Sequence, residues 1–430
     1  MFRHFRYSIS PVISIAVACL ALTAAAQEPL RLSRADAIHE ALARNPALVA
    51  ARAQVEEARA NVVTATAFAD PTLALDVAGQ SHLFNPGSGN ASDQGVGFTV
   101  PFPGKRRLRG EVATADLRAA EFNLTQLQQQ IAAQAAQAYD AILVALRHRE
   151  NLEQAKGFAS DFVQKTQARF LAGTVARVDV VKAQTDLASA ENDLIANERA
   201  IATARALLNR LLGRMGGAPI ETTDTLNVPL DVPAVEALEQ LAENSRPEIQ
   251  ALAAQLHGAA AATKLAKEFW APDFNLSATR NAADGTPTTF TSAVSIGVPI
   301  FYWQHKRGEV AAAQHREEEL QANLNDIRAQ VSLDVQTAFA NASTSLRQAI
   351  FIRDHLLPEA QEVYRVASVS YGLGGLSALD LLDAKRTLLD AETQYVDALG
   401  AANDAIAALE QAVGAPLVGA GSQPAQGVHP

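Results

Sequence analysis

Four short segments of the chain alternate apolar and polar residues with a period of two. In the segments 72–77 and 95–102, every second residue is large and apolar, and most residues between them are small or polar. The same alternation returns in 274–279 and 294–300. Because successive side chains of a strand point to opposite faces, this pattern predicts four β-strands, each with one apolar face. The Gly-, Asn- and Ser-rich segment 79–94 predicts a hairpin loop between the first two strands.

Strands with one apolar face suit a transmembrane β-barrel, in which strands of about 9 to 11 residues turn that face to lipid. A half-buried sheet of a soluble protein produces the same alternation and is the alternative. Four strands cannot close a barrel, and a strand edge that faces lipid leaves backbone groups without hydrogen-bond partners. A barrel would therefore need several copies of the chain, and three copies would supply twelve strands.

A long helical pattern with almost no Pro or Gly follows each pair of strands. The first runs from Arg107 to Ala172, and at 1.5 Å per residue it would span roughly 100 Å. Apolar residues recur at every seventh position, which is typical of helices packed as a coiled coil. An ordinary surface coiled coil would show the same repeat. The repeating positions are Leu117, Leu124, Ile131, Ala138, Ala145 and Leu152, then Val180, Leu187, Leu194, Ile201 and Leu208, and finally Leu381, Leu388, Tyr395, Ala402 and Leu409.

The chain is an internal duplication. Segment Pro46–Gly213 resembles Pro247–Gly414 at an offset of 201 residues. Around Arg109 the offset falls to 198, which a shorter hairpin loop and three extra residues in the second long helix would explain. Matching pairs include Pro71 with Pro272, Gly173 with Gly374, Asp179 with Asp380 and Glu191 with Glu392.

Shorter pieces flank the repeated elements. Each copy opens with an Ala-rich helical stretch, Asp36–Ala69 or Ala234–Phe269, and a proline lies just beyond each stretch. The polar residues 419–430 have the composition of a disordered tail. We therefore predict a signal peptide over 1–26, a first repeat over 27–217, a joining segment over 218–233 and a second repeat over 234–418.

The first 26 residues have the layout of a signal peptide. Basic residues at positions 3 and 6 precede an apolar run over 11–22, and Ala24 with Ala26 forms a small-residue cleavage pattern. The run is shorter than the roughly 20 residues of a membrane-spanning helix. We expect the mature, exported chain to begin near Gln27.

The single cysteine, Cys19, lies inside this segment. Cleavage would leave the mature chain without a thiol, which excludes disulfides and cysteine–metal sites. Lipoprotein processing at Cys19 is the alternative, although residues 16–18 lack the expected leucine. No later segment reaches the roughly 18 uninterrupted apolar residues of a membrane helix, so any crossing must use strands.

Charge and residue spacing narrow the classes of function. The net charge of −10 provides no basic field for nucleic acid and makes cations better candidates for cargo than polyanions. The nine histidines include no helical pair four residues apart, and no phosphate loop or nucleophile motif occurs. We therefore expect no enzymatic activity, no cofactor and no resident metal. The basic cluster at 105–109 is expected at a membrane rim or at the start of the long helix.

Two helix turns carry a resemblance to a known family. The segments Phe170–Gln184 (FLAGTVARVDVVKAQ) and Tyr371–Ala384 (YGLGGLSALDLLDA) resemble the two periplasmic tips of the TolC family of outer-membrane efflux proteins. The resemblance covers Arg31 to about Leu417. The strand exit VPFPGKR at 100–106 is similar to the heavy-metal branch, the CzcC- and CusC-like proteins.

The resemblance implies a mainly α fold with a small transmembrane β part. Long helix hairpins would form an α-barrel, and four strands per protomer would contribute to a trimeric, twelve-stranded barrel in the outer membrane. It also implies a homotrimer whose tips meet a periplasmic adaptor, which is coupled to an inner-membrane transporter, often of the resistance-nodulation-division type. Such a duct has no enzymatic activity.

The resemblance further implies roles for residues at the tips. Tyr371 and Asp179 match positions whose contacts keep the family's tip closed, whereas Leu376 replaces an arginine of that network. Adaptor contacts would fall on Gly173, Thr174, Val175, Gly374, Gly375 and Leu376, and the pore or gate would be lined by Asp380, Asp383, Asp179 and Tyr371.

Two of these carboxylates have a physical argument of their own. Asp380 and Asp383 lie three residues apart and share a helix face, so a trimer would place them in two stacked rings that attract cations. In the first copy Asp179 matches Asp380, but Lys182 replaces Asp383. Helix capping explains the duplicated aspartate equally well, which leaves Asp383 as the stronger candidate for a role in the pore.

These observations predict a passive outer-membrane efflux duct for metal cations or small toxic compounds. An exported coiled-coil scaffold is the alternative from another class, and a lipid-anchored periplasmic adaptor is a third. The adaptor would need a lipoyl-like β domain between its helices, and the sequence has no pattern for one.

Overall fold

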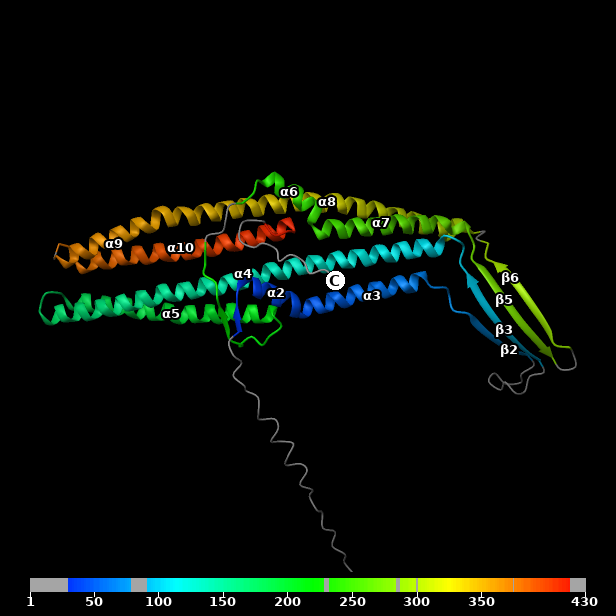
Figure 1. Cartoon of the computed structure of the whole chain (residues 1–430), viewed down its shortest axis with the longest axis horizontal. Coiled ribbons are helices and arrows are strands. Elements are labelled where there is room, and N and C mark those ends of the chain that lie inside the picture. Colours follow the sequence, from blue (N-terminus) through cyan, green and yellow to red (C-terminus); the bar gives the residue numbers. More distant parts are fainter. Residues whose placement is uncertain are drawn as a thin grey trace, which may run out of the picture. The chain divides into compact units, whose positions relative to one another are not determined.

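The computed structural model describes residues 30–78, 91–227, 232–283, 287–298, 301–373 and 375–417. The predicted signal peptide with Cys19, the tip residue Gly374 and the tail 419–430 lie outside these residues. Within them, the two halves of the chain repeat one order of elements: a short strand, two helices, two longer strands and a hairpin of long helices (Figure 1).

The element bounds follow this order. The first half contains β1 (Leu30–Leu32), α2 (Arg34–Arg44), α3 (Pro46–Thr66), β2 (Thr72–Ala78), β3 (Ala91–Val100), α4 (Lys105–Leu171) and α5 (Arg177–Leu211). The second half contains β4 (Ile220–Thr222), α6 (Val235–Ser245), α7 (Pro247–Lys267), the short η1 (Glu268–Trp270), β5 (Phe274–Ala283), β6 (Thr289–Ile296), α8 (Tyr302–Phe351), the π-helical turn η2 (Ile352–Leu356), α9 (Leu357–Gly372) and α10 (Ala378–Val413).

The Ala-rich stretches at the start of each copy are helical, as predicted, but neither is a single helix. Each stretch is two helices that break immediately before a proline, at Asn45 and at Arg246. Both residues have extended backbone, with ψ of 125° at Asn45 and 117° at Arg246. A proline ring clashes with a preceding residue in the helical region, which forces this conformation and lets Pro46 and Pro247 begin the next helix.

The four longer strands form one antiparallel sheet in the order β2-β3-β5-β6 (Figure 1). The central pair, β3 with β5, joins the two copies, and its register places Phe98 opposite Leu276. The predicted loop 79–94 is too long at its C-terminal end, because β3 begins at Ala91, which pairs with Ala283. The sequence of that end is polar, so the pairing with β5 decides its conformation.

The register gathers the large apolar residues on one face of the sheet. Strand pairing places Leu73 opposite Val96, Phe98 opposite Leu276, and Leu276 opposite Val294. The other face holds Thr, Asn, Ser, Asp and Gly residues. Every residue of β6 is exposed, and Phe290 and Val294 are 79% and 69% exposed. The apolar face is therefore uncovered in the chain itself.

The predicted coiled-coil positions lie at the helix contacts. Ile131, Ala138 and Ala145 of α4 are buried, as are Ile201 and Leu208 of α5. In α10 the buried positions are Leu381, Leu388, Ala402 and Leu409. The heptad prediction is therefore confirmed for these positions.

The second long helix contains one extra residue that the first lacks, at the π-helical turn η2. Before this turn, buried positions of the two copies differ by 200, as in Ile131 and Val331. After it they differ by 201, as in Ala159 and Ala360. A π-helical turn accommodates one inserted residue without breaking the helix. It therefore accounts for one of the three extra residues predicted in this helix.

The chain folds into two compact units, and each unit draws on both copies. The first unit contains residues 30–45, 131–227 and 343–407, and the second contains 46–130, 232–342 and 408–417. The first unit holds the two helix-hairpin turns, and the second holds the four-stranded sheet. In the part of the chain that the structure describes, none of the helices has the length and apolar character needed to cross a membrane.

Candidate functional site

The turn of the first helix hairpin is a glycine-dependent helix end. Gly173 has a φ of +74°, in the left-handed region that other residues rarely adopt. The backbone N–H and the hydroxyl of Thr174 both donate to the carbonyl of Arg169, each at 3.0 Å. Gly173 and Thr174 are exposed and Val175 is half-buried, so the turn presents its backbone and small side chains to solvent.

The turn of the second hairpin repeats this arrangement. Gly375 N–H donates to the carbonyl of Ser370 at 2.8 Å, which is the same bond as that of Thr174 displaced by 201 positions. Leu376 is half-buried and packs with Tyr371 against the apolar cluster of Ala367, Leu381 and Ala384. Leu376, which replaces the arginine that the resemblance implies, is therefore part of the helix packing.

Asp380 and Asp179 both act as capping residues. Asp380 Oδ2 accepts from the backbone N–H and the hydroxyl of Ser377, at 3.1 and 2.7 Å, and the backbone N–H of Asp380 donates to the Ser377 hydroxyl in return. Asp179 Oδ2 accepts only from the backbone N–H of Ala176, at 3.2 Å, because Ala176 has no hydroxyl to reciprocate. These bonds satisfy backbone donors at the starts of α10 and α5.

The other predicted gate residues form no hydrogen bonds with one another among the residues that the structure describes. Asp383 is exposed on α10, and so is Lys182 at the matching position of α5. The structure contains no hydrogen bond between Tyr371 and Asp179 among its described residues. Instead, the guanidinium of Arg169 lies 4.4 Å from the centre of the Tyr371 ring, which links the end of α4 to the end of α9. Arg169 is a tip residue that sequence reasoning missed.

A buried charged cluster lies deeper in the same unit. Asp140 of α4 has a side chain only 4% exposed, and Arg34 Nε at the start of α2 donates to it at 3.1 Å. The backbone N–H of Arg34 donates to Asp224 at 2.6 Å. The hydroxyl of Tyr139, next to Asp140, donates to the carbonyl of Leu32 at 2.9 Å. These bonds fasten β1, α2 and the segment after β4 to the middle of α4.

Burial raises the pKa of Asp140, and the Arg34 guanidinium opposes that effect. Burial and the charge of Asp140 raise the pKa of Asp404, on the facing side of α10, to about 6. The single positive charge of Arg34 therefore lies near three carboxylates, those of Asp140, Asp224 and Asp404. A charge at position 140, inside an apolar helix face, was the signal in the sequence that could have revealed this cluster.

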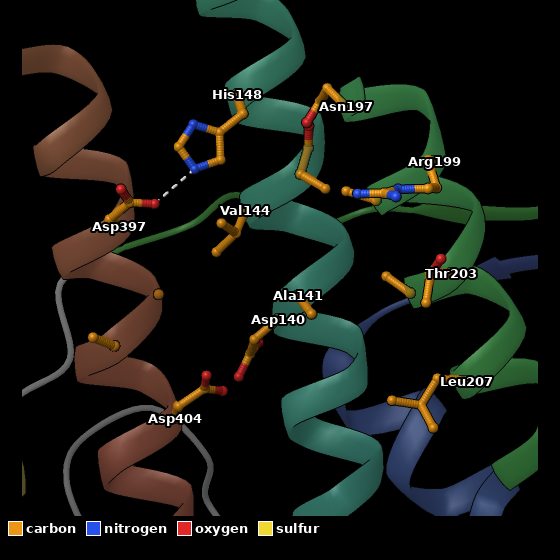
Figure 2. Close-up of a pocket in the computed structure, with 15 residues that line it drawn as sticks. Asp140, Ala141, Val144, His148, Asn197, Arg199, Thr203, Leu207, Asp397 and Asp404 are labelled. Carbon is orange, nitrogen blue, oxygen red and sulfur yellow. Dashed lines mark hydrogen bonds and ion pairs between the residues drawn. The ribbon is translucent and has the colours of Figure 1, made fainter. Parts of the chain in front are cut away.

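A cavity of about 930 Å³ lies beside the cluster, between α4, α5 and α10 (Figure 2). Its walls are mainly apolar and include Ala141, Val144 and Leu207. At one end His148 Nε2 lies 2.9 Å from a carboxylate oxygen of Asp397. At the other end Asp404 and Asp140 point toward each other (Figure 2).

Comparison with known proteins places this geometry in a family. The sequence profile of the outer membrane efflux proteins matches residues 37–214 and 238–415. The cobalt-zinc-cadmium resistance protein CzcC of Cupriavidus metallidurans is 26% identical over 297 residues, which cover 68% of this chain and 70% of that protein. The pyoverdine export outer membrane protein OpmQ of Pseudomonas aeruginosa is 24% identical over 383 residues, which cover 82% and 78%.

Solved structures agree on the fold. A crystal structure of CusC superimposes with a TM-score of 0.76 at 20% sequence identity, covering 92% of this chain and 95% of that one. The family match spans most of both copies, and the strands and long helix hairpins superimpose with those of an outer-membrane channel. The chain therefore belongs to the outer membrane efflux protein family: it is a TolC-like efflux channel protein of the outer membrane, and not an enzyme.

Proposed function

We propose that the chain is the outer-membrane duct of a tripartite efflux system. It works as a homotrimer, receives substrates from a periplasmic adaptor and an inner-membrane pump, and conducts them passively outward. The observation that carries this proposal is the sheet, which has one uncovered apolar face and two free edges, β2 and β6. Free edges are incompatible with lipid, so the sheet needs further copies of itself.

The duplication predicts how neighbouring protomers would pair. Because β3 of the first copy pairs with β5 of the second, β6 should pair with β2 of the next protomer in the equivalent register. The pair Phe98–Leu276 then corresponds to Ile296 of one protomer and Leu75 of its neighbour. A scaffold protein with a soluble sheet has no reason to form this contact.

Cysteine cross-linking tests the assembly directly. We expect Leu75→Cys combined with Ile296→Cys to form a covalent trimer on mild oxidation, because facing antiparallel residues have Cα atoms within the reach of a disulfide. Ala74→Cys with Ile296→Cys is the control, since residue 74 lies on the opposite face. A water-soluble, elongated dimer without cross-links at residues 73, 75 or 77 would contradict the proposal.

For the substrate, we propose metal cations. The name of CzcC states cobalt, zinc and cadmium resistance, whereas that of OpmQ states pyoverdine export. The similar strand exit and the acidic net charge favour cations. Because the pump would select the substrate, the test is capture of the partner pump by affinity purification, followed by tolerance of the host to zinc, cobalt and cadmium with and without this chain. Unchanged tolerance would remove metals from the proposal.

Within this duct, Asp383 is proposed to select cations at the second tip. Its carboxylate is exposed and free of the capping role that Asp380 has. We expect Asp383→Ala to move the reversal potential of the reconstituted channel toward zero in a salt gradient. Asp390→Ala, an exposed aspartate two turns further along α10, should leave it unchanged. Equal reversal potentials for both variants would contradict a role of Asp383.

A further inference from the structure

The cavity between α4, α5 and α10 has the size and wall chemistry of a small-molecule site. Its volume of about 930 Å³ lies within the range of roughly 300 to 1,000 Å³ that is usual for ligand pockets. Alanine, valine, leucine and glycine make up most of its lining, the Asp140–Asp404 and His148–Asp397 groups lie on the α4 and α10 side, and Arg199 and Thr203 line it from α5 (Figure 2). Such a lining suits a ligand with an apolar body.

The charges around the cavity are unbalanced. Asp140 is paired with Arg34, and Asp397 is paired with His148. Asp404 forms no ion pair with any residue that the structure describes, and Figure 2 shows it directed at Asp140. The only other basic residue in the lining is Arg199, on α5. The Asp140–Asp404 end therefore carries a negative charge that the chain does not neutralise.

The negative charge of Asp140 affects the pKa of Asp404. The charge of Asp140 adds to burial in raising the pKa of Asp404 to about 6, while Arg34 acts in the opposite direction. Asp404 is therefore mostly ionised at neutral pH, next to a like charge. A bound cation would relieve this repulsion.

The charge is specific to one copy of the duplication. The residue of the first copy that matches Asp404 is Thr203, which lines the same cavity from α5. The match of Asp397 is Ala196. The unpaired carboxylate is therefore not a feature of the repeated helix packing.

A metal ion does not fit this site. The described residues contain no group of three His, Cys, Asp or Glu side chains that could hold one. We propose that the cavity binds an organic cation, with its charged group against Asp404 and Asp140 and its apolar body along Val144 and Leu207. This inference goes beyond the duct, because it does not depend on the oligomer or on what the duct conducts.

Ethidium is a suitable probe, since it has a permanent positive charge on an apolar aromatic body. Its fluorescence polarisation would be measured with the purified full-length protein, and anionic fluorescein serves as the charge control. We expect ethidium to bind and fluorescein not to bind. At pH 5 ethidium should bind roughly tenfold more weakly than at pH 7.5, because protonation of Asp404 removes its charge.

Two variants and one control test whether ethidium binds in this cavity or elsewhere on the protein. Asp404→Asn should weaken ethidium binding roughly tenfold at pH 7.5 and abolish the pH dependence, since it keeps the shape and removes the charge. Ala204→Trp should abolish binding by filling the apolar wall. Asp390→Asn on the same helix lies outside the cavity and should bind as the natural chain does.

The proposal fails if ethidium binds all four proteins equally, or if it does not bind the natural chain. The channel conductance of each variant is measured in parallel. Loss of ethidium binding with normal conductance would support the site and leave the duct function intact, whereas lost conductance with normal ethidium binding would count against the duct alone.

Discussion

The two copies of the duplicated unit agree in their backbone contacts and differ in their charges. At each proline break, the residue before the proline donates from its side chain to a carbonyl at the end of the last helix of the same copy. Asn45 Nδ2 donates to the carbonyl of Leu211 at 2.9 Å, and Arg246 Nη1 donates to the carbonyl of Ala412, the matching position, at 3.2 Å. Gly213 and Gly414 follow those helix ends, both with positive φ.

The charged residues that carry our proposals appear in one copy only. Asp383 corresponds to Lys182, and Asp404 corresponds to Thr203. Asp140 corresponds to Ala340, because the offset before the π-helical turn is 200. The comparison teaches that the two copies share their helix breaks and buried helix positions, whereas these three charged residues belong to one copy only. Variants that exchange or remove the residues that differ test this comparison of the two copies.

The largest expected effect comes from Asp140→Ala. Removing the buried carboxylate leaves the Arg34 guanidinium without its ion-pair partner. Because that guanidinium is about one-third exposed, we expect the free energy of unfolding to fall by about 2–3 kcal/mol. Thermal or denaturant unfolding would measure it. The control in the other copy is Asn341→Ala, an exposed position next to Ala340, where a change within about 0.5 kcal/mol is expected. Equal effects would contradict the asymmetry.

The helix caps at the tips come next. Ser377→Ala would give the second tip the chemistry of the first, and we expect it to destabilise the start of α10 by about 1 kcal/mol. Ala176→Ser should install the reciprocal bond at the start of α5 and slow hydrogen exchange there. Unchanged exchange at both helix starts would show that the caps do not set local stability.

Asp404→Asn should have a smaller effect on stability whose size depends on pH. The folded chain raises the pKa of Asp404 from its ordinary value of 3.8 to about 6, so ionisation lowers the stability of the folded form as pH rises between these values. We expect the variant to melt about 1–2 °C higher than the natural chain at pH 7.5, an effect kept small by solvent screening. At pH 3.5 the two proteins should melt together. A higher melting temperature of the variant at both pH values would contradict this explanation.

The smallest effect is predicted for deletion of Asp354 from the π-helical turn. This turn contains no buried residue, and removing one residue would make the second long helix regular, like the first. We expect the fold and the melting temperature to change little. Deletion of Ala159, within the regular helix α4, is the control and should disrupt packing, because it rotates every following position by about 100°.

The fold was largely readable from the sequence, because each prediction rested on a pattern that repeats. The alternation of apolar and polar residues predicted the strands, and the seven-residue repeat predicted buried positions of the long helices. The offset of 201 residues related the two copies. The helix breaks before Pro46 and Pro247 were missed, because the alanine-rich sequence on both sides favours a helix. The proline ring forces the residue before it into an extended conformation, which ends the first helix. The end of the loop 79–94 was missed because pairing with a distant strand decided it.

The candidate sites were less predictable. The capping roles of Asp179 and Asp380 followed from their distance to a glycine turn, which is local information. The contact of Arg169 with Tyr371 and the group of Arg34, Asp140 and Asp404 join residues that are separated by hundreds of positions. No spacing rule connects such residues, so only the folded helices bring them together.

The pairing of β3 with β5 has a consequence for the origin of the assembly. A half-length ancestor with two strands and one helix hairpin could have closed the same ring only as six identical subunits, because every strand pair between copies would have lain between chains. Joining two such units in one chain makes half of those contacts contacts within the chain. In the proposed trimer the ring would have threefold in place of sixfold symmetry, so that a side chain could differ at three positions from the residue at the other three.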